Sequence, residues 1–288
     1  MRLGKVLGVN LKVHYLFLLW LLLAVTLGDA TSTLVMLFSV MVHELGHMFA
    51  AVNLGLKVQE IELMPFGGVA KLRGFTSGNP KEEATLALGG PANSLVLLCI
   101  GLLNHLTPWG AALLESNVLL LLVNLLPVMP LDGGRILRSY LVRQEGLLQG
   151  TRKVLVHTFR VAWGFVAVAT VLFLLGILSI NAVALGIFLL HAAWQEKKML
   201  PYQVMNYVAR GTSELWQARV LPGKLVMVHP DTAVVQAVET MTPGCYHVFN
   251  VVRPNGEILT VSEDKICQAL VGKGVRTTFA DIVNERRI

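Results

Sequence analysis

Two histidines and a glutamate in the segment "MVHELGHMFA", residues 41–50, have the types and spacing of a zinc site. His43 and His47 are one helical turn apart, so both imidazoles would project from the same face of a helix and could bind one metal ion. Glu44 lies about 100° around that helix from His43, where it could reach a water molecule at the metal without being a ligand. The alternative is a polar cluster that only joins helices, but a buried glutamate between two histidines is costly in an apolar segment.

A catalytic zinc site needs a third protein ligand, with one position left for water. The best candidate is Asp132 in "NLLPVMPLDGGR", residues 124–135. Two prolines precede it and remove backbone donors, and membrane proteins tolerate such irregular backbone only where it is buried in protein or lines a cavity. Asp132 could also be an ordinary turn residue beside glycines. Because the histidine pair needs an anionic partner, we expect His43, His47 and Asp132 to bind one Zn²⁺ per chain.

The composition indicates that a membrane surrounds these residues. Hydrophobic residues make up 54% of the 288 residues and charged residues only 15%, which is typical of a polytopic α-helical membrane protein. We expect six transmembrane helices, of which the first also resembles a signal peptide but has no clear cleavage site. The expected spans are residues 13–27, 33–54, 84–104, 112–131, 158–178 and 180–194.

The net charge of +6 is explained by the loops between these spans. From Val220 onward seven Lys and Arg balance seven Asp and Glu, so the excess lies among the hydrophobic segments and does not indicate a nucleic-acid partner. Lysines and arginines occur in every second loop, whereas the loops around 28–32, 105–111 and 178–181 contain none. The positive-inside rule therefore predicts that both termini face the cytoplasm.

Residues 57–74, "KVQEIELMPFGGVAKLRG", alternate partly in the manner of strands. We expect a short β-hairpin that dips toward the membrane, with Phe66, Gly67 and Gly68 at its centre. An edge of this hairpin could bind an unwound substrate as an added strand. The alternative is an amphipathic loop on the bilayer surface.

Residues 196–219 contain Lys197 and Lys198 and are predicted to be an interfacial linker. Residues 220–288 alternate short strands and helices, and this α/β module resembles one copy of a CBS domain. CBS domains usually act in pairs that bind adenine nucleotides, so a single copy implies homo-oligomerisation or contact with a partner, and leaves nucleotide binding in doubt. The three cysteines form no C-x-x-C pair and indicate no disulfide framework.

Three ordered motifs together resemble the site-2 proteases, which are intramembrane zinc metalloproteases. They are "HELGH" at 43–47, "GGPANS" at 89–94, where an asparagine follows a glycine–proline pair, and "NLLPVMPLDGG" at 124–134. The resemblance covers about residues 1–195. It implies that the two histidines and Asp132 are zinc ligands and that Glu44 is the catalytic residue. It also places Asn124 near the active site, where the residue orients substrate, stabilises the oxyanion or packs between helices.

The interval between His47 and Asn93 is too short for an inserted PDZ domain. The plan therefore resembles the stage IV sporulation protein FB branch, with a six-span domain at 1–195, a linker at 196–219 and a CBS-like domain at 220–288. That branch implies cleavage of an inactive pro-sigma factor in the mother-cell membrane around the forespore, under the control of membrane inhibitor proteins. A proteolytically inactive membrane scaffold and a metal or proton transporter are the alternatives.

Overall fold

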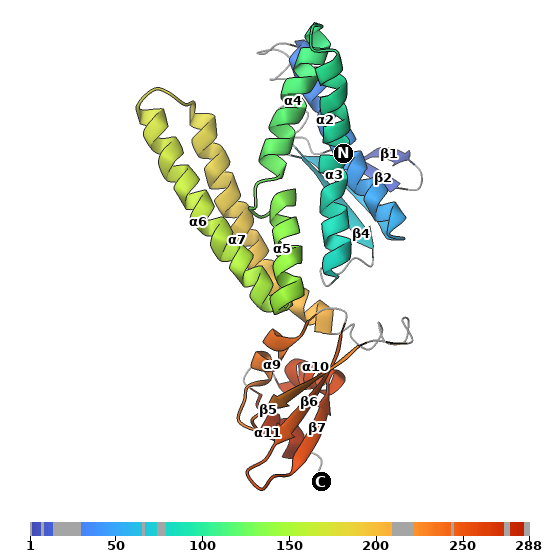
Figure 1. Ribbon diagram of the computed structural model, residues 1–288, viewed down its shortest axis with the longest axis vertical. Coiled ribbons are helices and arrows are strands. Elements are labelled where there is room, and N and C mark those ends of the chain that lie inside the picture. The colour runs from blue at the N-terminus through green and yellow to red at the C-terminus, as the bar shows by residue number, and fades with distance from the viewer. Residues whose placement is uncertain are drawn as a thin grey trace. The chain divides into compact units, whose positions relative to one another are not determined.

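The computed structural model describes residues 2–6, 9–13, 30–64, 67–73, 79–208, 220, 222–242, 245–273 and 277–284. Helices dominate the described residues (Figure 1). The chain divides into two compact units. The first comprises Met1–Phe75 with Lys81–Ile136, and the second comprises Thr76–Pro80 with Leu137–Ile288.

Three apolar helices and a sheet build the first unit. The helices are α2 (Ala30–Asn53), α3 (Pro80–Leu103) and α4 (Pro108–Asn124). Thr107 caps α4, because its hydroxyl accepts a hydrogen bond from Gly110 N at 3.2 Å, and Pro108 occupies the first turn, where no backbone donor is needed.

Small and polar residues hold α2 against its two neighbouring helices. A Cβ on Gly46 of α2 or on Gly89 of α3 would lie less than 3.0 Å from the other helix's backbone, so the two backbones touch. Asn93 Nδ2 of α3 donates to Val42 O of α2 at 2.8 Å. From α4, Asn117 Nδ2 donates to Ser39 Oγ of α2 at 2.9 Å. The middle of α2 is therefore fixed from two sides.

The four-stranded sheet of this unit has the order β1-β2-β3-β4, formed by Arg2–Val6, Val9–Val13, Lys57–Met64 and Gly67–Arg73. β3 and β4 pair antiparallel and form the predicted hairpin. β2 pairs parallel with β3, and β1 pairs antiparallel with β2. The two N-terminal strands were not expected, because they precede the first expected span at 13–27. They cover one edge of a hairpin that would be only marginally stable alone.

A tight turn joins α2 to this sheet. Gly55 adopts a positive φ of 71°, and Leu56 N donates to Ala51 O at 3.0 Å, which is the Schellman pattern at a helix end. Leu54 and Leu56 pack against Ala50 and Ala51. β3 therefore begins within four residues of the end of α2.

The second unit contains the long helices α6 (Leu147–Leu174) and α7 (Ile180–Val208), which pack side by side and are joined by a short turn with Gly176 at φ 73°. Before them, α5 (Asp132–Glu145) begins in the first unit. Residues 132–157, expected as a loop, are thus largely helical. Arg138, Ser139 and Val142 of α5 are buried, and this buried face was obscured in the sequence by the basic residues around it.

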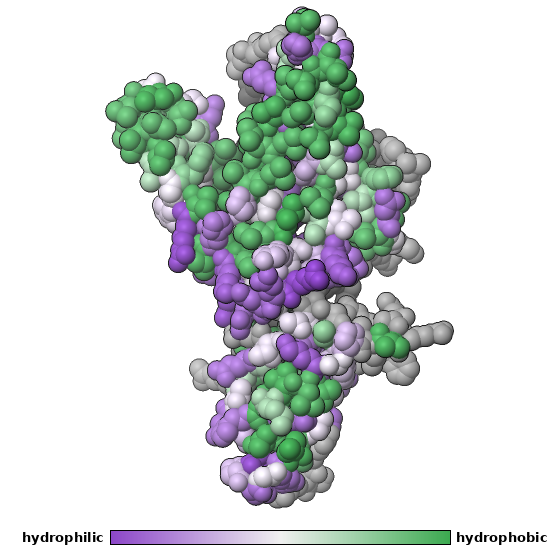
Figure 2. All heavy atoms as spheres, viewed as in Figure 1, coloured by the Kyte–Doolittle hydropathy of each residue, from purple (hydrophilic) through white to green (hydrophobic). Residues whose placement is uncertain are grey.

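Three helices in the described part of the chain are long and apolar enough to cross a membrane, namely Ala30–Asn53, Pro80–Leu103 and Leu147–Leu174. Pro108–Asn124 is a shorter apolar helix. Figure 2 shows hydrophobic residues over the outer surface of α4 and over the ends of α6 and α7 that the turn joins. The expected first span, 13–27, lies outside the described residues except for Val13.

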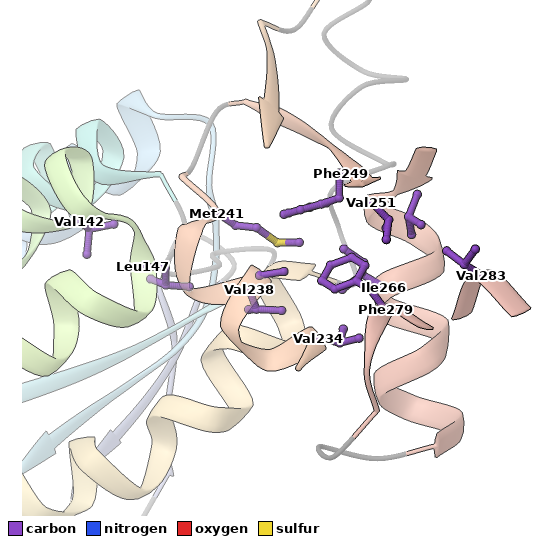
Figure 3. Packing of buried hydrophobic residues seen from close by; sticks show 12 residues of the cluster. Val142, Leu147, Val234, Val238, Met241, Phe249, Val251, Ile266, Phe279 and Val283 are labelled. Atoms are coloured by element: carbon purple, nitrogen blue, oxygen red, sulfur yellow. The ribbon is translucent and has the colours of Figure 1, made fainter. Parts of the chain in front are cut away.

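The rest of the second unit is an α/β module, as predicted for residues 220–288. Its sheet has the order β5-β6-β7, with β5 parallel to β6 and β7 antiparallel to β6. Phe249, Val251, Ile266 and Phe279 lie at the centre of its core, which also includes Leu147 of α6 (Figure 3). The elements of the module are β5 (Gly223–Val228), α9 (Val234–Thr240), β6 (Tyr246–Val252), β7 (Ile258–Ser262), α10 (Glu263–Lys273) and α11 (Phe279–Asn284).

Candidate metal centre

The structure brings His43, His47 and Asp132 together at one point. The two histidines lie one turn apart in the middle of α2, and Asp132 is the first residue of α5. Asp132 Oδ2 lies 3.1 Å from His43 Nε2 and 3.3 Å from His47 Nε2. The two Nε2 atoms are 3.2 Å apart. Residues 89 positions apart in sequence thus present three ligand atoms to the same small volume.

This cluster is largely removed from solvent. The side chains of His43 and Asp132 are 4% and 9% exposed, and that of His47 is 19% exposed. A buried carboxylate with two imidazoles in an apolar helix bundle needs a strong partner. His47 is thus the most exposed of the three residues.

The ligand atoms have the spacing that zinc requires. A tetrahedral Zn²⁺ with bonds of about 2.0–2.2 Å keeps its ligand atoms about 3.3–3.6 Å apart. The observed separations of 3.1, 3.2 and 3.3 Å lie at or just below the lower end of this range. Two imidazole nitrogens and one carboxylate are also a donor set that catalytic zinc commonly has, with a fourth position free for water. These residues could therefore hold one Zn²⁺.

The outer nitrogen of His47 is fixed by the neighbouring helix α3. Its Nδ1 lies 2.7 Å from Leu86 O and 3.3 Å from Gly90 N. The shorter contact is to a carbonyl, which can only accept, so it favours the tautomer with the proton on Nδ1. Nε2 then presents its lone pair to the cluster, which is the tautomer that a metal ligand needs.

Glycines place Asp132 at the start of α5. A Cβ on Gly133 would collide with the backbone of Leu125, and a Cβ on Gly134 would collide with the backbone of Val128. The proline-containing turn after α4 therefore packs directly against the first turn of α5. This contact fixes where α5 starts and thus where the carboxylate of Asp132 lies.

The other predicted site residues lie on several elements of the first unit. Glu44 follows His43 on α2 and is half-buried, and Asn124 is the last residue of α4. Gly67 and Gly68 begin β4, where they pair with Met64 and Leu63. Phe66 lies outside the described residues.

Comparisons with known proteins identify the family. The sequence model of peptidase family M50 matches residues 31–107. A zinc metalloprotease of Methanocaldococcus jannaschii is 30% identical over 278 residues, which cover 90% of this chain and 76% of that protein. The chain belongs to peptidase family M50. The M50 assignment confirms the resemblance to site-2 proteases, and the chain is a zinc metalloendopeptidase.

Two further matches agree with the M50 assignment. Stage IV sporulation protein FB of Bacillus subtilis is 33% identical over 141 residues, which cover 46% of this chain and 49% of that protein. The solved structure of a site-2 protease from M. jannaschii matches with a TM-score of 0.52 and 29% identity, covering 68% of this chain and 94% of the other. With its apolar helices, the M50 chain is an integral membrane protein. These relatives favour a protease over the scaffold and the transporter.

Sequence reasoning missed what α3 contributes to this M50 site. It used "GGPANS" only as a family motif, yet a Cβ on Gly90 would lie less than 3.0 Å from Nε2 of both His43 and His47. Ser94 Oγ lies 2.9 Å from His43 Nδ1. Leu86, Gly90 and Ser94 are four residues apart, and this spacing indicates that they share one face of a helix. Only the structure shows that this face meets α2.

Proposed function

We propose that this M50 enzyme cuts membrane-associated protein substrates within the bilayer, with Zn²⁺ held by His43, His47 and Asp132. The observation that carries this proposal is the convergence of the three ligand atoms within 4.8 Å of one another among apolar helices. When bound, zinc supplies a Lewis acid that activates water at neutral pH and polarises a peptide carbonyl.

Glu44 is proposed to move the protons of the reaction. It accepts a proton from the attacking water and returns it to the leaving amine, which is general base and then general acid catalysis. Its place beside His43 on α2 and its half-buried state support this role, because a side chain next to a ligand on the same helix can reach a water at the metal without being a ligand. Asn124, at the end of α4, is proposed to hydrogen-bond the substrate or the oxyanion.

The substrate is proposed to bind in an extended form along β4. A peptide bond in a helix is shielded, so the substrate must unwind before attack. β4 is an edge strand of the described sheet, and both β3 and β4 contact α2, the helix that carries the histidines. An added strand at this edge would bring the substrate backbone toward the metal ligands.

A strand-like complex predicts a specific crosslinking pattern. With a cysteine in place of Ala70 in β4, cysteines placed successively along the substrate are expected to form disulfides with a period of two. Crosslinking is measured as a size shift on non-reducing gels. A period of three to four would mean a helical substrate and would contradict the proposal.

The predicted arrangement in the membrane is retained as a proposal: six spans, with both termini in the cytoplasm. It is supported by the basic residues in alternate loops. The predicted division at 195 and 219 is also retained, with the linker continuing α7 as far as Val208. Near that boundary Lys198 Nζ lies 3.3 Å from the centre of the Trp194 ring, a pair suited to the membrane–water interface.

The substrate is proposed to be an inactive pro-sigma factor, cut during sporulation in the mother-cell membrane around the forespore and controlled by membrane inhibitor proteins. The similarity to Stage IV sporulation protein FB supports this, over about half of each chain. The test is co-expression with candidate membrane-tethered pro-factors, scored for a decrease in size. Release that requires Glu44 supports the proposal, and release that proceeds equally without Glu44 overturns it.

The C-terminal module is proposed to be a single CBS-like domain through which the enzyme forms homo-oligomers. The outer face of its sheet carries Leu225, Met227 and Ile258, which are 61%, 57% and 52% exposed. Such a face is unusual on an isolated soluble module, and a two-fold axis would pair it with itself. Nucleotide binding by this module stays a prediction.

Replacing Leu225 with lysine should therefore weaken self-association. We expect the mass of the detergent-solubilised chain to shift toward the monomer, with the dissociation constant of the oligomer raised at least about tenfold because burying an unpaired charge costs more than about 1.4 kcal/mol. Mass photometry across a dilution series would measure it. Val220→Lys is the matched control, since Val220 is 83% exposed but precedes the sheet. Equal masses for wild type and Leu225→Lys would argue against this interface.

A further inference from the structure

One face of α3 lines the histidine pair without supplying a ligand. Leu86, Gly90 and Ser94 are four residues apart, so they form a stripe along this helix. Leu86 contributes its carbonyl to His47. Gly90 contributes the space that a side chain would fill. Ser94 contributes its hydroxyl to His43. Each member of the stripe thus meets the imidazoles in a different way.

The geometry points to Ser94 as a positioning residue for the metal site: its hydroxyl holds the His43 imidazole with Nε2 directed at the metal. This inference rests on the proposed zinc ligation by His43, His47 and Asp132. Ser94 is fully buried, and its Oγ lies 2.9 Å from His43 Nδ1, so water cannot easily replace it.

The role follows from the chemistry of the two ring nitrogens. His43 can bind a metal through Nε2 only when Nδ1 carries the proton. Nδ1 then needs an acceptor, and Ser94 Oγ is at hydrogen-bonding distance. Without that acceptor the ring can rotate, or the proton can sit on Nε2 and donate to Asp132 Oδ2 at 3.1 Å, which blocks the lone pair. Ser94 therefore favours the ligating tautomer and orientation.

The Ser94 hydroxyl that contacts His43 differs from the Leu86 carbonyl that contacts His47 in its hydrogen-bonding capacity. A carbonyl only accepts, so the 2.7 Å contact with Leu86 O favours the His47 tautomer with the proton on Nδ1. A hydroxyl can donate or accept, so Ser94 satisfies His43 both before the metal binds and afterwards. Metal loading then leaves no buried nitrogen without a partner on this side of the cluster.

Ser94 is not needed to join α2 and α3. Asn93 Nδ2 already bonds to Val42 O at 2.8 Å, and Gly46 and Gly89 bring the two backbones together. A substitution at Ser94 should therefore change metal binding more than it changes folding.

The test measures metal binding by the full-length protein in detergent. Ser94→Ala is expected to weaken zinc affinity about 10–100-fold, the usual cost of losing a ligand's outer partner, and Ser94→Thr is expected to restore it. With cobalt in place of zinc, Ser94→Ala should also shift the visible absorption bands, because the imidazole changes orientation. Thermal unfolding of the metal-free protein should be similar for all variants.

Ser39→Ala is the matched control, because Ser39 is equally buried on α2 but bonds to Asn117. Its zinc affinity and cobalt spectrum should match those of the wild type. Wild-type affinity in Ser94→Ala, or equal weakening in Ser39→Ala, would overturn the inference about Ser94 alone. A wild-type protein that binds no zinc would instead overturn the proposed metal site.

Discussion

Replacing Glu44 with glutamine will leave one zinc ion per chain and lower the rate of peptide cleavage by about 10²–10⁴-fold. Glutamine has the shape of glutamate, but its amide cannot accept the proton of the attacking water. Glu44 is not among the three residues that converge on the metal position, so the ligand set stays intact. The cleavage step should therefore fail while metal binding does not.

The two quantities are measured separately, zinc by elemental analysis of the purified protein and cleavage by single-turnover assay in detergent or vesicles. Glu115→Gln is the matched control. Glu115 is an exposed glutamate on α4, and its substitution should leave both quantities unchanged. Retained cleavage in Glu44→Gln would exclude Glu44 as the general base, and loss of zinc would mean that it helps to hold the ion.

Gly90→Ala is expected to abolish zinc binding although it adds only one methyl group. The new Cβ would lie less than 3.0 Å from Nε2 of both His43 and His47, in the space that the ion and its ligand atoms share. Movement of α3 cannot relieve the collision without breaking the contact of Gly89 with Gly46. We expect zinc affinity to fall by more than the about 10–100-fold of an outer-partner change, and cleavage to fall with it.

Gly164→Ala provides the control for this change. Gly164 lies inside α6, and a Cβ there would meet no heavy atom within 4 Å. Both substitutions remove a helical glycine and should raise helix propensity by about 1 kcal/mol, so only steric contact distinguishes them. Titration with zinc and a fluorescent chelator compares the two variants. Equal affinity in Gly90→Ala and the wild type would show that the cluster does not hold the ion where its ligand atoms converge.

The metal cluster could be predicted because its parts carry strong local signals. An i, i+4 histidine pair defines a helical face without any knowledge of the fold. Asp132 could be identified from the irregular backbone that the prolines and glycines before and after it impose, which indicates a buried, specific position. Its exact partner atoms required the structure, because the spacing of 89 residues to His43 contains no geometric information.

The contributions of α3 and of the N-terminal strands could not be predicted, because both depend on contacts with segments that are distant in the sequence. A buried serine or glycine in an apolar helix looks the same in sequence whether it packs or touches a ligand. β1 and β2 are short and basic, and only the pairing of β1 with β2 and of β2 with β3 makes them strands. In α5, by contrast, the buried face itself includes Arg138, so a pattern of apolar residues alone did not reveal the helix.

The close contact of Gly46 with Gly89 has a consequence for how a substrate arrives. An α-helix with its side chains is about 10–12 Å across, whereas the seam between α2 and α3 has no room for even one added carbon at these glycines. A hydrogen bond from Asn93 Nδ2 to Val42 O also joins the two helices there. A lateral portal cannot open there without separating α2 from α3, so a polypeptide must approach the histidine pair from another side of α2.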